Sequence, residues 1–135
     1  MILGVGIDLV HVPAFADQLG DRMSQFVNAT FTAEEIAYSE SASSRRPAQH
    51  LAARYAAKEA ALKALDAACA CMGITPPRVS LRDIEVARDR SGRPSLQFHA
   101  TAAALAVSAS VDRAWVSLTH DGDYAAAVVT LERVG

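Results

Sequence analysis

An alanine-rich segment over residues 48–70 constrains the fold of this chain more than any other feature. The segment stops near Gly73 and Pro76, so it predicts one long helix. Its small side chains indicate that the helix packs closely on a neighbouring element. Glu59 and Lys63 stand one helical turn apart within it. Desolvating a charge that has no partner is costly, so both side chains need partners.

The N-terminal apolar run, residues 2–10, predicts a strand whose two faces differ. By the two-residue alternation of a strand, one face holds Val5, Ile7 and Leu9, and the other holds Gly4, Gly6, Asp8 and Val10. Two glycines beside an aspartate indicate that another backbone approaches the second face closely. Asp8 stands where a buried strand would carry Val or Ile. A divalent cation with a phosphate ligand would satisfy Asp8, Glu59 and Lys63 together.

The remaining segments predict helices and strands in an order typical of an α+β fold. We expect short helices at 13–19 and 101–109, and another helix after the capping-box pattern Thr32-x-x-Glu35. We expect strands at 81–87, 96–98, 114–119 and 124–131, with a hairpin turn at Asp121-Gly122-Asp123 between the last two. The expected architecture is one domain, residues 1–135, with a mainly antiparallel sheet packed on the long helix and shorter helices.

Composition narrows the classes of function. The chain has 135 residues and a net charge of -2, which argues against broad nucleic-acid binding. The N-terminus has no basic region, and Asp8 interrupts its apolar run, so we expect neither a signal peptide nor a membrane span. Cys69 and Cys71 form a poor zinc motif and are interpreted as packing residues in a reducing compartment. We therefore expect a cytoplasmic protein.

The charges of the long helix allow two interpretations. At about 100° per residue, an apolar stripe contains Lys58 and has Glu59 and Lys63 at its edge; its apolar members are Leu51, Tyr55, Leu62 and Leu65. The first interpretation is an ordinary Glu59–Lys63 ion pair, with Lys58 reaching out to water. The second is a Mg²⁺ site at Glu59 with Lys63 or Lys58 on a phosphate. Spacing alone cannot place Asp8 beside Glu59.

Five short motifs resemble those of the holo-[acyl-carrier-protein] synthase family, the small 4'-phosphopantetheinyl transferases. In chain order they are Gly4-Val5-Gly6-Ile7-Asp8, Phe31-Thr32-x-x-Glu35, the segment from Arg54 to Lys63, Gly92-Arg93-Pro94, and Val116-Ser117-Leu118-Thr119-His120-Asp121 with Tyr124 to Val128. Each motif is weak alone, but the five together are specific and span nearly the whole chain. The resemblance implies the small 4'-phosphopantetheinyl transferase-like fold.

The resemblance also implies a reaction. Family members transfer 4'-phosphopantetheine from coenzyme A to a serine of an apo acyl carrier protein, in fatty acid biosynthesis, and release adenosine 3',5'-bisphosphate. Asp8 and Glu59 match the family's Mg²⁺ ligands, with Mn²⁺ as an alternative, and Lys63 matches its phosphate-contacting lysine. These three residues are the expected catalytic group. The base that accepts the serine proton is left unassigned.

The coenzyme A nucleotide implies a second set of residues. By resemblance, Arg54 lies near the 3'-phosphate with Arg45 or Arg46, and Lys58 is a further phosphate candidate. The turn Gly92-Arg93-Pro94 lines the adenine side, and Thr119 and His120 lie near the nucleotide. Simpler interpretations stay open: a solvated basic loop at Arg45 and Arg46, a plain β-turn at Gly92-Arg93-Pro94, and a structural His120.

Family members are homotrimers with active sites at subunit interfaces, so the resemblance implies a homotrimer. One departure concerns the carrier: Ala14 stands where the family often has an arginine that meets the carrier's acidic helix. We hypothesise a different carrier contact set, with Arg22 and Arg45 or Arg46 remaining, and a carrier domain of a large synthase as one partner. If Arg22→Glu and Arg45→Glu leave the carrier's KM unchanged, this docking hypothesis is wrong.

Two alternatives to the transferase remain at this point. One is another Mg²⁺-dependent phosphotransferase or phosphohydrolase of coenzyme A-like nucleotides, which would yield free phosphopantetheine with water as the acceptor. The other is a noncatalytic trimeric binding module, which would keep the packing glycines and lose the metal ligands. Both Asp8 and Glu59 are present, which argues against the binding module.

Overall fold

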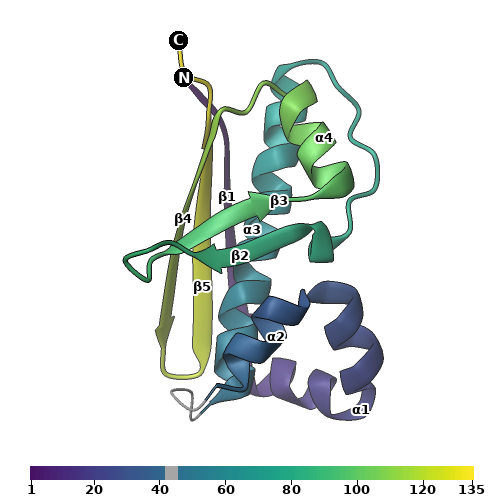
Figure 1. The fold of residues 1–135 in the computed structure, drawn as a ribbon, viewed down its shortest axis with the longest axis vertical. Helices are drawn as coiled ribbons and strands as arrows, with labels where there is room; N and C mark the ends of the chain where they lie inside the picture. The colour runs from purple at the N-terminus through teal and green to yellow at the C-terminus, as the bar shows by residue number, and fades with distance from the viewer. Residues whose placement is uncertain (42–45) are drawn as a thin grey trace.

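A three-stranded antiparallel sheet packs against the long helix α3 (Pro47–Cys71) in the computed structural model (Figure 1). The structure describes residues 1–41 and 46–135, with the side chains of residues 21–24 excepted. The strand order is β1 (Ile2–His11), β5 (Tyr124–Glu132) and β4 (Arg113–Asp121). The two chain ends lie side by side, where the Met1 amino group donates to the Arg133 carbonyl at 2.7 Å.

Strand β1 lies directly on the backbone of α3 because two glycines face the helix. A Cβ atom on Gly6 would lie 1.8 Å from the Ala60 carbonyl oxygen, and one on Gly4 would lie 2.1 Å from that of Ala64. Both alanines are fully buried. This confirms the predicted close approach and explains why the helix is rich in alanine.

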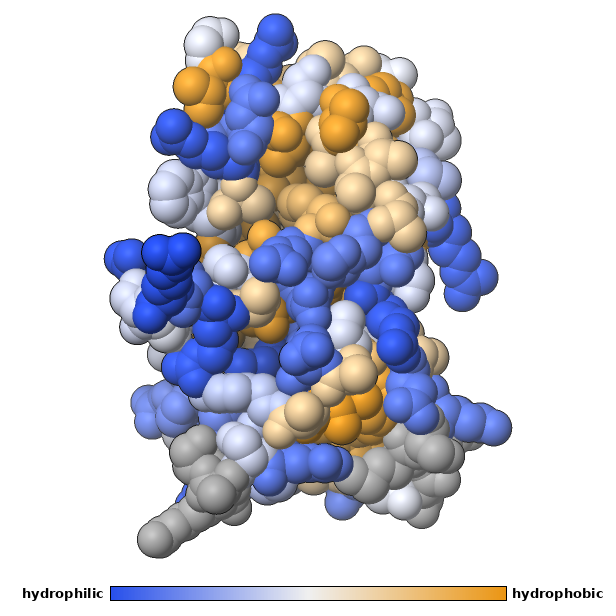
Figure 2. All heavy atoms as spheres, viewed as in Figure 1, coloured by the Kyte–Doolittle hydropathy of each residue, from blue (hydrophilic) through white to orange (hydrophobic). Residues whose placement is uncertain are grey.

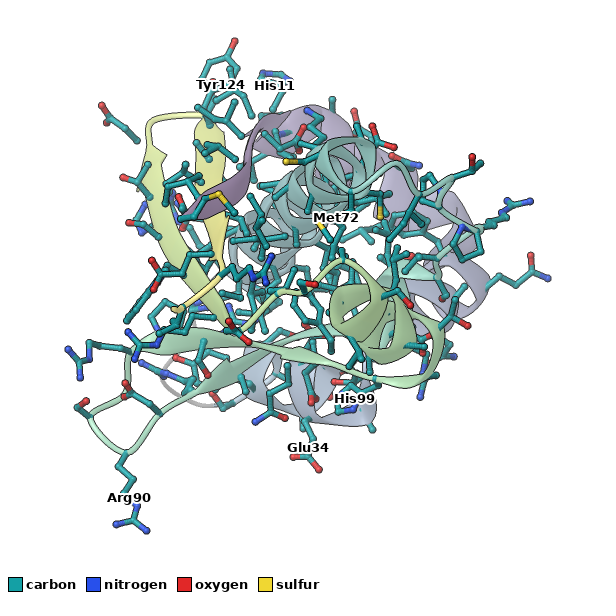
Figure 3. The ribbon with its side chains drawn as sticks, turned by 90° about the horizontal axis from the view of Figure 1, so that it is seen from above. His11, Glu34, Met72, Arg90, His99 and Tyr124 are labelled. Atoms are coloured by element: carbon teal, nitrogen blue, oxygen red, sulfur yellow. The ribbon has the colours of Figure 1, made fainter. Side chains whose placement is uncertain are left out.

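The other side of α3 is covered by smaller elements (Figures 1 and 3). They are α2 (Ala33–Ser39), the short 3-10 helix η1 (Leu81–Asp83), the hairpin of β2 (Ile84–Arg88) and β3 (Pro94–Phe98), and α4 (Ala100–Ser108). Figure 2 shows a polar belt across the middle of this face, over β2 and β3, with apolar groups gathered above it around α4. Helix α1 (Val12–Thr30) follows β1 at the opposite end.

The predicted α+β architecture, its antiparallel pairing and the Thr32–Glu35 capping box are confirmed. Several predicted boundaries differ from the structure, two of them by three residues or more. Helix α1 continues to Thr30, well beyond residue 19, and passes through Gly20, which does not adopt the positive φ typical of a glycine that ends a helix. Residues 81–83 form a 3-10 turn, and the strand begins only at Ile84. Within the described residues, no helix is both long enough and apolar enough to cross a membrane.

The outer face of the three-stranded sheet is apolar and exposed. In β1, Val5 is 56%, Ile7 66% and Leu9 65% exposed. In the neighbouring strands, Trp115 and Val128 are also exposed and stand in the same cross-strand rows. Ser117, Thr119 and Thr130 stand between these side chains in the same rows. Exposed apolar side chains gathered on one face are typical of protein contact surfaces.

Candidate active site

Asp8 lies on the side of β1 that faces α3, beyond the two glycines. Its side chain is 19% exposed, and Oδ1 accepts a hydrogen bond from Lys63 Nζ at 3.1 Å. Lys63 also donates to the Ile7 carbonyl oxygen at 2.9 Å. Lys63 therefore connects the helix to the strand. Its ion-pair partner among the described residues is Asp8, and not Glu59 as the interpretation of an ordinary ion pair within the helix expected.

Glu59 and Asp8 line the same cavity, of about 320 Å³, between β1, α1 and α3. Tyr55 lines it as well. Burial, and then the negative charge of Glu59 and a hydrogen-bonding interaction with that carboxylate, raise the pKa of Tyr55 to about 12. The phenol therefore stays protonated at neutral pH and can donate to Glu59.

The donor set of this cavity suits Mg²⁺. Two carboxylates face one open cavity, and Mg²⁺ is usually held by one or two carboxylates together with substrate phosphates and waters. In the described part of the chain, no cluster of three or more His, Cys, Asp or Glu side chains could form a site made by protein alone. Lys63 already places a cationic group against Asp8, so the carboxylate is positioned for a cation.

Lys58 is not available to a ligand, and its prediction as a phosphate contact is corrected. The side chain is fully buried, where Nζ pairs with Glu35 Oε1 at 2.7 Å and donates to the carbonyls of Leu81 at 3.0 Å and Ile84 at 2.6 Å. Three acceptors satisfy all the donors of an ammonium group. The alternative that Lys58 reaches out to water is wrong for the same reason. Lys58 joins α3 to α2 and β2.

Arg54 is 6% exposed, and its guanidinium stacks on the Tyr38 ring at 4.6 Å. Nη1 donates to the His50 carbonyl at 3.4 Å, whereas the buried Nε has no hydrogen-bond partner among the described residues. Burial, offset only in part by Tyr38 and Glu35, lowers the pKa of Arg54. Arg88 stacks on the same ring at 4.6 Å and donates to its hydroxyl.

Positive charge gathers around this group. Burial, and then the charges of Arg54, His120 and Arg88, lower the pKa of His50. His120, exposed near the end of β4, hydrogen-bonds through Nδ1 with Gln49 Nε2 at 3.0 Å. The structure therefore brings Arg54 and His120 into one region, as an anion-binding role requires. Thr119 precedes His120 and is also exposed.

The Gly92-Arg93-Pro94 turn joins β2 to β3. Gly92 has φ +82, a conformation that favours glycine. The Asp89 carboxylate accepts hydrogen bonds from the backbone N–H groups of Ser91 and Arg93, and it forms an ion pair with Arg93 Nε at 3.2 Å. The hydrogen bond from the Arg93 backbone is the main cause of the lowered pKa of Asp89. Arg93 and Pro94 line a cavity that β4 completes. Arg45 lies outside the described residues.

The two groups of predicted residues lie on different sides of α3. Glu59 and Arg54 are five positions apart, which places them about 140° apart around a helix. Glu59 faces the cavity with β1 and α1, whereas Arg54 lines a cavity with α2 and β2. In Figure 3, His11 lies on the β1 side of the helix, and Glu34 and His99 lie on the other. Within one subunit, the two groups therefore line separate cavities.

Three residues of these groups were missed by reasoning from the sequence. Tyr55 was interpreted as part of the apolar stripe, and neither Arg88 nor Tyr38 carried a signal that would have assigned it a role. A helical-spacing argument could have paired Tyr55 with Glu59, since they are four residues apart. The stacking of Tyr38 with Arg54 and Arg88 joins three separate elements, which no local pattern reveals.

Comparisons with known proteins agree over the whole chain. Residues 4–129 match the model of the 4'-phosphopantetheinyl transferase superfamily. The chain is 41% identical to a holo-[acyl-carrier-protein] synthase of Geobacter sulfurreducens, over 98% of this chain and 99% of that one. It resembles the structure of a Chronobacterium ammoniagenes ACPS–CoA complex, with TM-score 0.79, 39% identity and 98% of each chain covered. It also resembles the Mycobacterium tuberculosis acyl carrier protein synthase, with TM-score 0.72, 40% identity, and 99% and 100% covered.

Proposed function

Because the chain belongs to the 4'-phosphopantetheinyl transferase superfamily, we propose that it transfers 4'-phosphopantetheine from coenzyme A to a serine of an apo acyl carrier protein. Adenosine 3',5'-bisphosphate is the other product. The observation that carries the proposal is the convergence of Asp8, Glu59 and Lys63 on β1 and α3. Relatives named holo-[acyl-carrier-protein] synthase align with 98% and 99% of the chain, at 41% and 39% identity.

Asp8 and Glu59 would hold Mg²⁺, or Mn²⁺ in its place. The bound metal would neutralise charge on the pyrophosphate of coenzyme A. Tyr55, which lines the same cavity, would orient the Glu59 carboxylate by donating a hydrogen bond to it. Lys63 would release Asp8 and place its ammonium on a phosphate oxygen, where it stabilises the charge that develops as the phosphoanhydride breaks. Its side chain is 55% exposed, so it is free to make that movement.

The serine hydroxyl of the carrier attacks the phosphorus that bears pantetheine. A new serine–phosphate bond forms and the bond to the nucleotide phosphate breaks, while the serine proton passes to a carboxylate or a water in the site. No residue of the enzyme is covalently modified. Arg54, Thr119, His120 and the turn Gly92-Arg93-Pro94 would bind the nucleotide, with Arg45 as a further contact. Burial disfavours the charged form of the Arg54 guanidinium, and a phosphate bound next to it would offset that cost.

A homotrimer would complete the site. The exposed apolar face of the sheet offers the contact surface, and the separation of Glu59 from Arg54 around α3 favours a site shared by two subunits. We further propose that the chain acts as a single domain in the cytoplasm, in fatty acid biosynthesis.

Intact-mass spectrometry of an apo acyl carrier protein tests the proposal. The carrier is incubated with this protein, coenzyme A and Mg²⁺, with a chelator and with Glu59→Ala as controls. A mass gain of one phosphopantetheine, absent from both controls, is expected. No gain on several apo carriers, despite binding of coenzyme A, would contradict it, and free phosphopantetheine would indicate a hydrolase.

A further inference from the structure

The half-buried ring of Tyr38 joins three elements around one cavity. Tyr38 lies on α2, and its ring contacts the guanidinium groups of Arg54 from α3 and Arg88 from β2, each with Cζ 4.6 Å from the ring centroid. Arg88 also donates to the Tyr38 hydroxyl, and its Nε donates to the Gly92 carbonyl at 3.0 Å. All three side chains line a cavity of about 310 Å³. One neutral ring therefore holds two cations at the edge of the same cavity.

The positive charge of this pair is not balanced by its contacts. Arg54 is 6% exposed, and its buried Nε has no hydrogen-bond partner among the described residues. In the same part of the chain, no ion pair joins Arg54 or Arg88 to a carboxylate. The two guanidinium groups also repel each other, and a buried donor without a partner is costly. An anion in the cavity would relieve both costs.

The carboxylates that line the cavity already have other contacts or lie at the surface. Glu35 forms its ion pair with the buried Lys58 at 2.7 Å, and Glu85 hydrogen-bonds with His99 at 3.0 Å. Glu34 is exposed, and its side chain points away from the fold in Figure 3. The anion must therefore come from a ligand.

We infer that Tyr38 is a positioning residue that holds Arg54 and Arg88 together as one clamp for a doubly charged phosphate group. Under the proposed function, on which this inference rests, that group is the 3'-phosphate of coenzyme A. The resemblance assigned Arg54 to this phosphate; Arg88 supplies a second guanidinium, and the Tyr38 ring fixes the spacing of the two. Paired, charge-assisted hydrogen bonds join guanidinium groups to phosphate oxygens. The clamp therefore selects coenzyme A over dephospho-coenzyme A, which has an uncharged hydroxyl in place of the phosphate.

The test compares nucleotides that differ only in the 3'-phosphate. Isothermal titration calorimetry gives the Kd of adenosine 3',5'-bisphosphate and of adenosine 5'-monophosphate. Steady-state transfer gives KM and kcat for coenzyme A and dephospho-coenzyme A. The variants are Tyr38→Leu, Tyr38→Phe and Arg88→Gln. Arg90→Gln is the matched control, because Arg90 loses the same charge on the same hairpin but is exposed and points away from the fold (Figure 3).

The wild type is expected to bind the bisphosphate at least about tenfold more tightly than the monophosphate. Tyr38→Leu and Arg88→Gln should each weaken binding of the bisphosphate by about tenfold and leave binding of the monophosphate unchanged. Both should raise the KM for coenzyme A at an unchanged kcat. Tyr38→Phe keeps the ring and should recover most of the affinity. Arg90→Gln should behave as the wild type.

The inference is overturned if Tyr38→Leu weakens both nucleotides equally, or if Arg88→Gln and Arg90→Gln are indistinguishable. Arg88 is exposed, so Arg88→Gln decides the question even if loss of the Tyr38 ring unfolds the subunit. Failure of the proposed function looks different: no carrier would gain phosphopantetheine from either coenzyme, whereas calorimetry would still show whether the bisphosphate is preferred.

Discussion

Lys58 and Glu59 are neighbours in α3 and have unlike roles. Lys58 points into the core and ties Glu35 of α2 to the backbone at the start of β2, whereas Glu59 faces the cavity with Asp8. The rotation of about 100° between consecutive helical residues separates them. The sequence placed Lys58 within the apolar stripe and Glu59 at its edge, but only the positions of α2 and β2 show that Lys58 is buried against Glu35.

Loss of the Lys58 ammonium should leave Glu35 as an unpaired buried charge. We expect Lys58→Met to lower the free energy of unfolding by about 3–5 kcal/mol, measured by urea denaturation. The control is the double variant Lys58→Met with Glu35→Leu, which removes both charges and should recover much of the loss. A single-variant loss below about 1 kcal/mol would show that the pair is not buried as described.

Glu85 should make stability depend on pH. Burial opposes its ionisation, but hydrogen bonds from Thr32 at 2.7 Å and with His99 at 3.0 Å outweigh burial and lower its pKa below the usual 4.5. As pH falls, Glu85 therefore takes up a proton in the unfolded chain before it does so in the folded chain. The ionised Glu85 stabilises the fold fully above about pH 4.5, and this stabilisation is lost as pH falls through the lower pKa that Glu85 has in the folded chain.

The comparison of wild type with Glu85→Gln isolates this contribution. The variant should be less stable by about 1 kcal/mol at pH 7, and the difference should shrink as pH falls toward 3. Denaturant titrations at several pH values measure it. A difference that stays constant over that range would contradict the lowered pKa.

At the scale of elements, the contact between β1 and α3 sets the position of Asp8. The sequence predicted the strand, the helix and the close approach, because two glycines on one face of a strand leave room for a second backbone. It could not predict which helix approaches, so it could not pair Asp8 with Lys63. It also misplaced the end of α1, which runs on through Gly20 to Thr30.

Gly6→Ala tests that contact. The added methyl would lie 1.8 Å from the Ala60 carbonyl, which is backbone and cannot turn aside. We expect a loss of about 3 kcal/mol or more in stability, read from thermal unfolding. Gly20→Ala is the matched control, since nothing lies within 4 Å of Gly20, and it should be neutral or stabilising by up to about 1 kcal/mol. Equal effects of the two substitutions would contradict the packing of β1 on α3.

At the scale of the whole molecule, the proposed trimer rests on the outer sheet face and on the two groups that lie on different sides of α3. The alternation in β1 predicted which of its residues share a face, but an exposed and a covered apolar face look alike in a sequence. Only the fold shows that Ile7 and its neighbours have no cover within one subunit.

Ile7→Glu should break the trimer without unfolding the subunit, because Ile7 is 66% exposed in the single chain. A carboxylate there would be desolvated on assembly. We expect light scattering to report a monomer with nearly unchanged circular dichroism and little transferase activity. Thr101→Glu is the control, since Thr101 is exposed on α4, away from the sheet face. A trimer that survives Ile7→Glu would place the subunit interface elsewhere.

The most direct test of the shared site mixes two inactive variants. Glu59→Gln removes a carboxylate of one group, and Arg54→Gln removes the guanidinium of the other; each is first checked for thermal unfolding and trimer mass. After the two are unfolded together and refolded at equal amounts, phosphopantetheine transfer should return to about one quarter of the wild-type rate, the fraction of intact sites in random trimers. If the mixture stays as inactive as its parents although mixed trimers form, Glu59 and Arg54 act within one subunit, and the site is not shared between subunits.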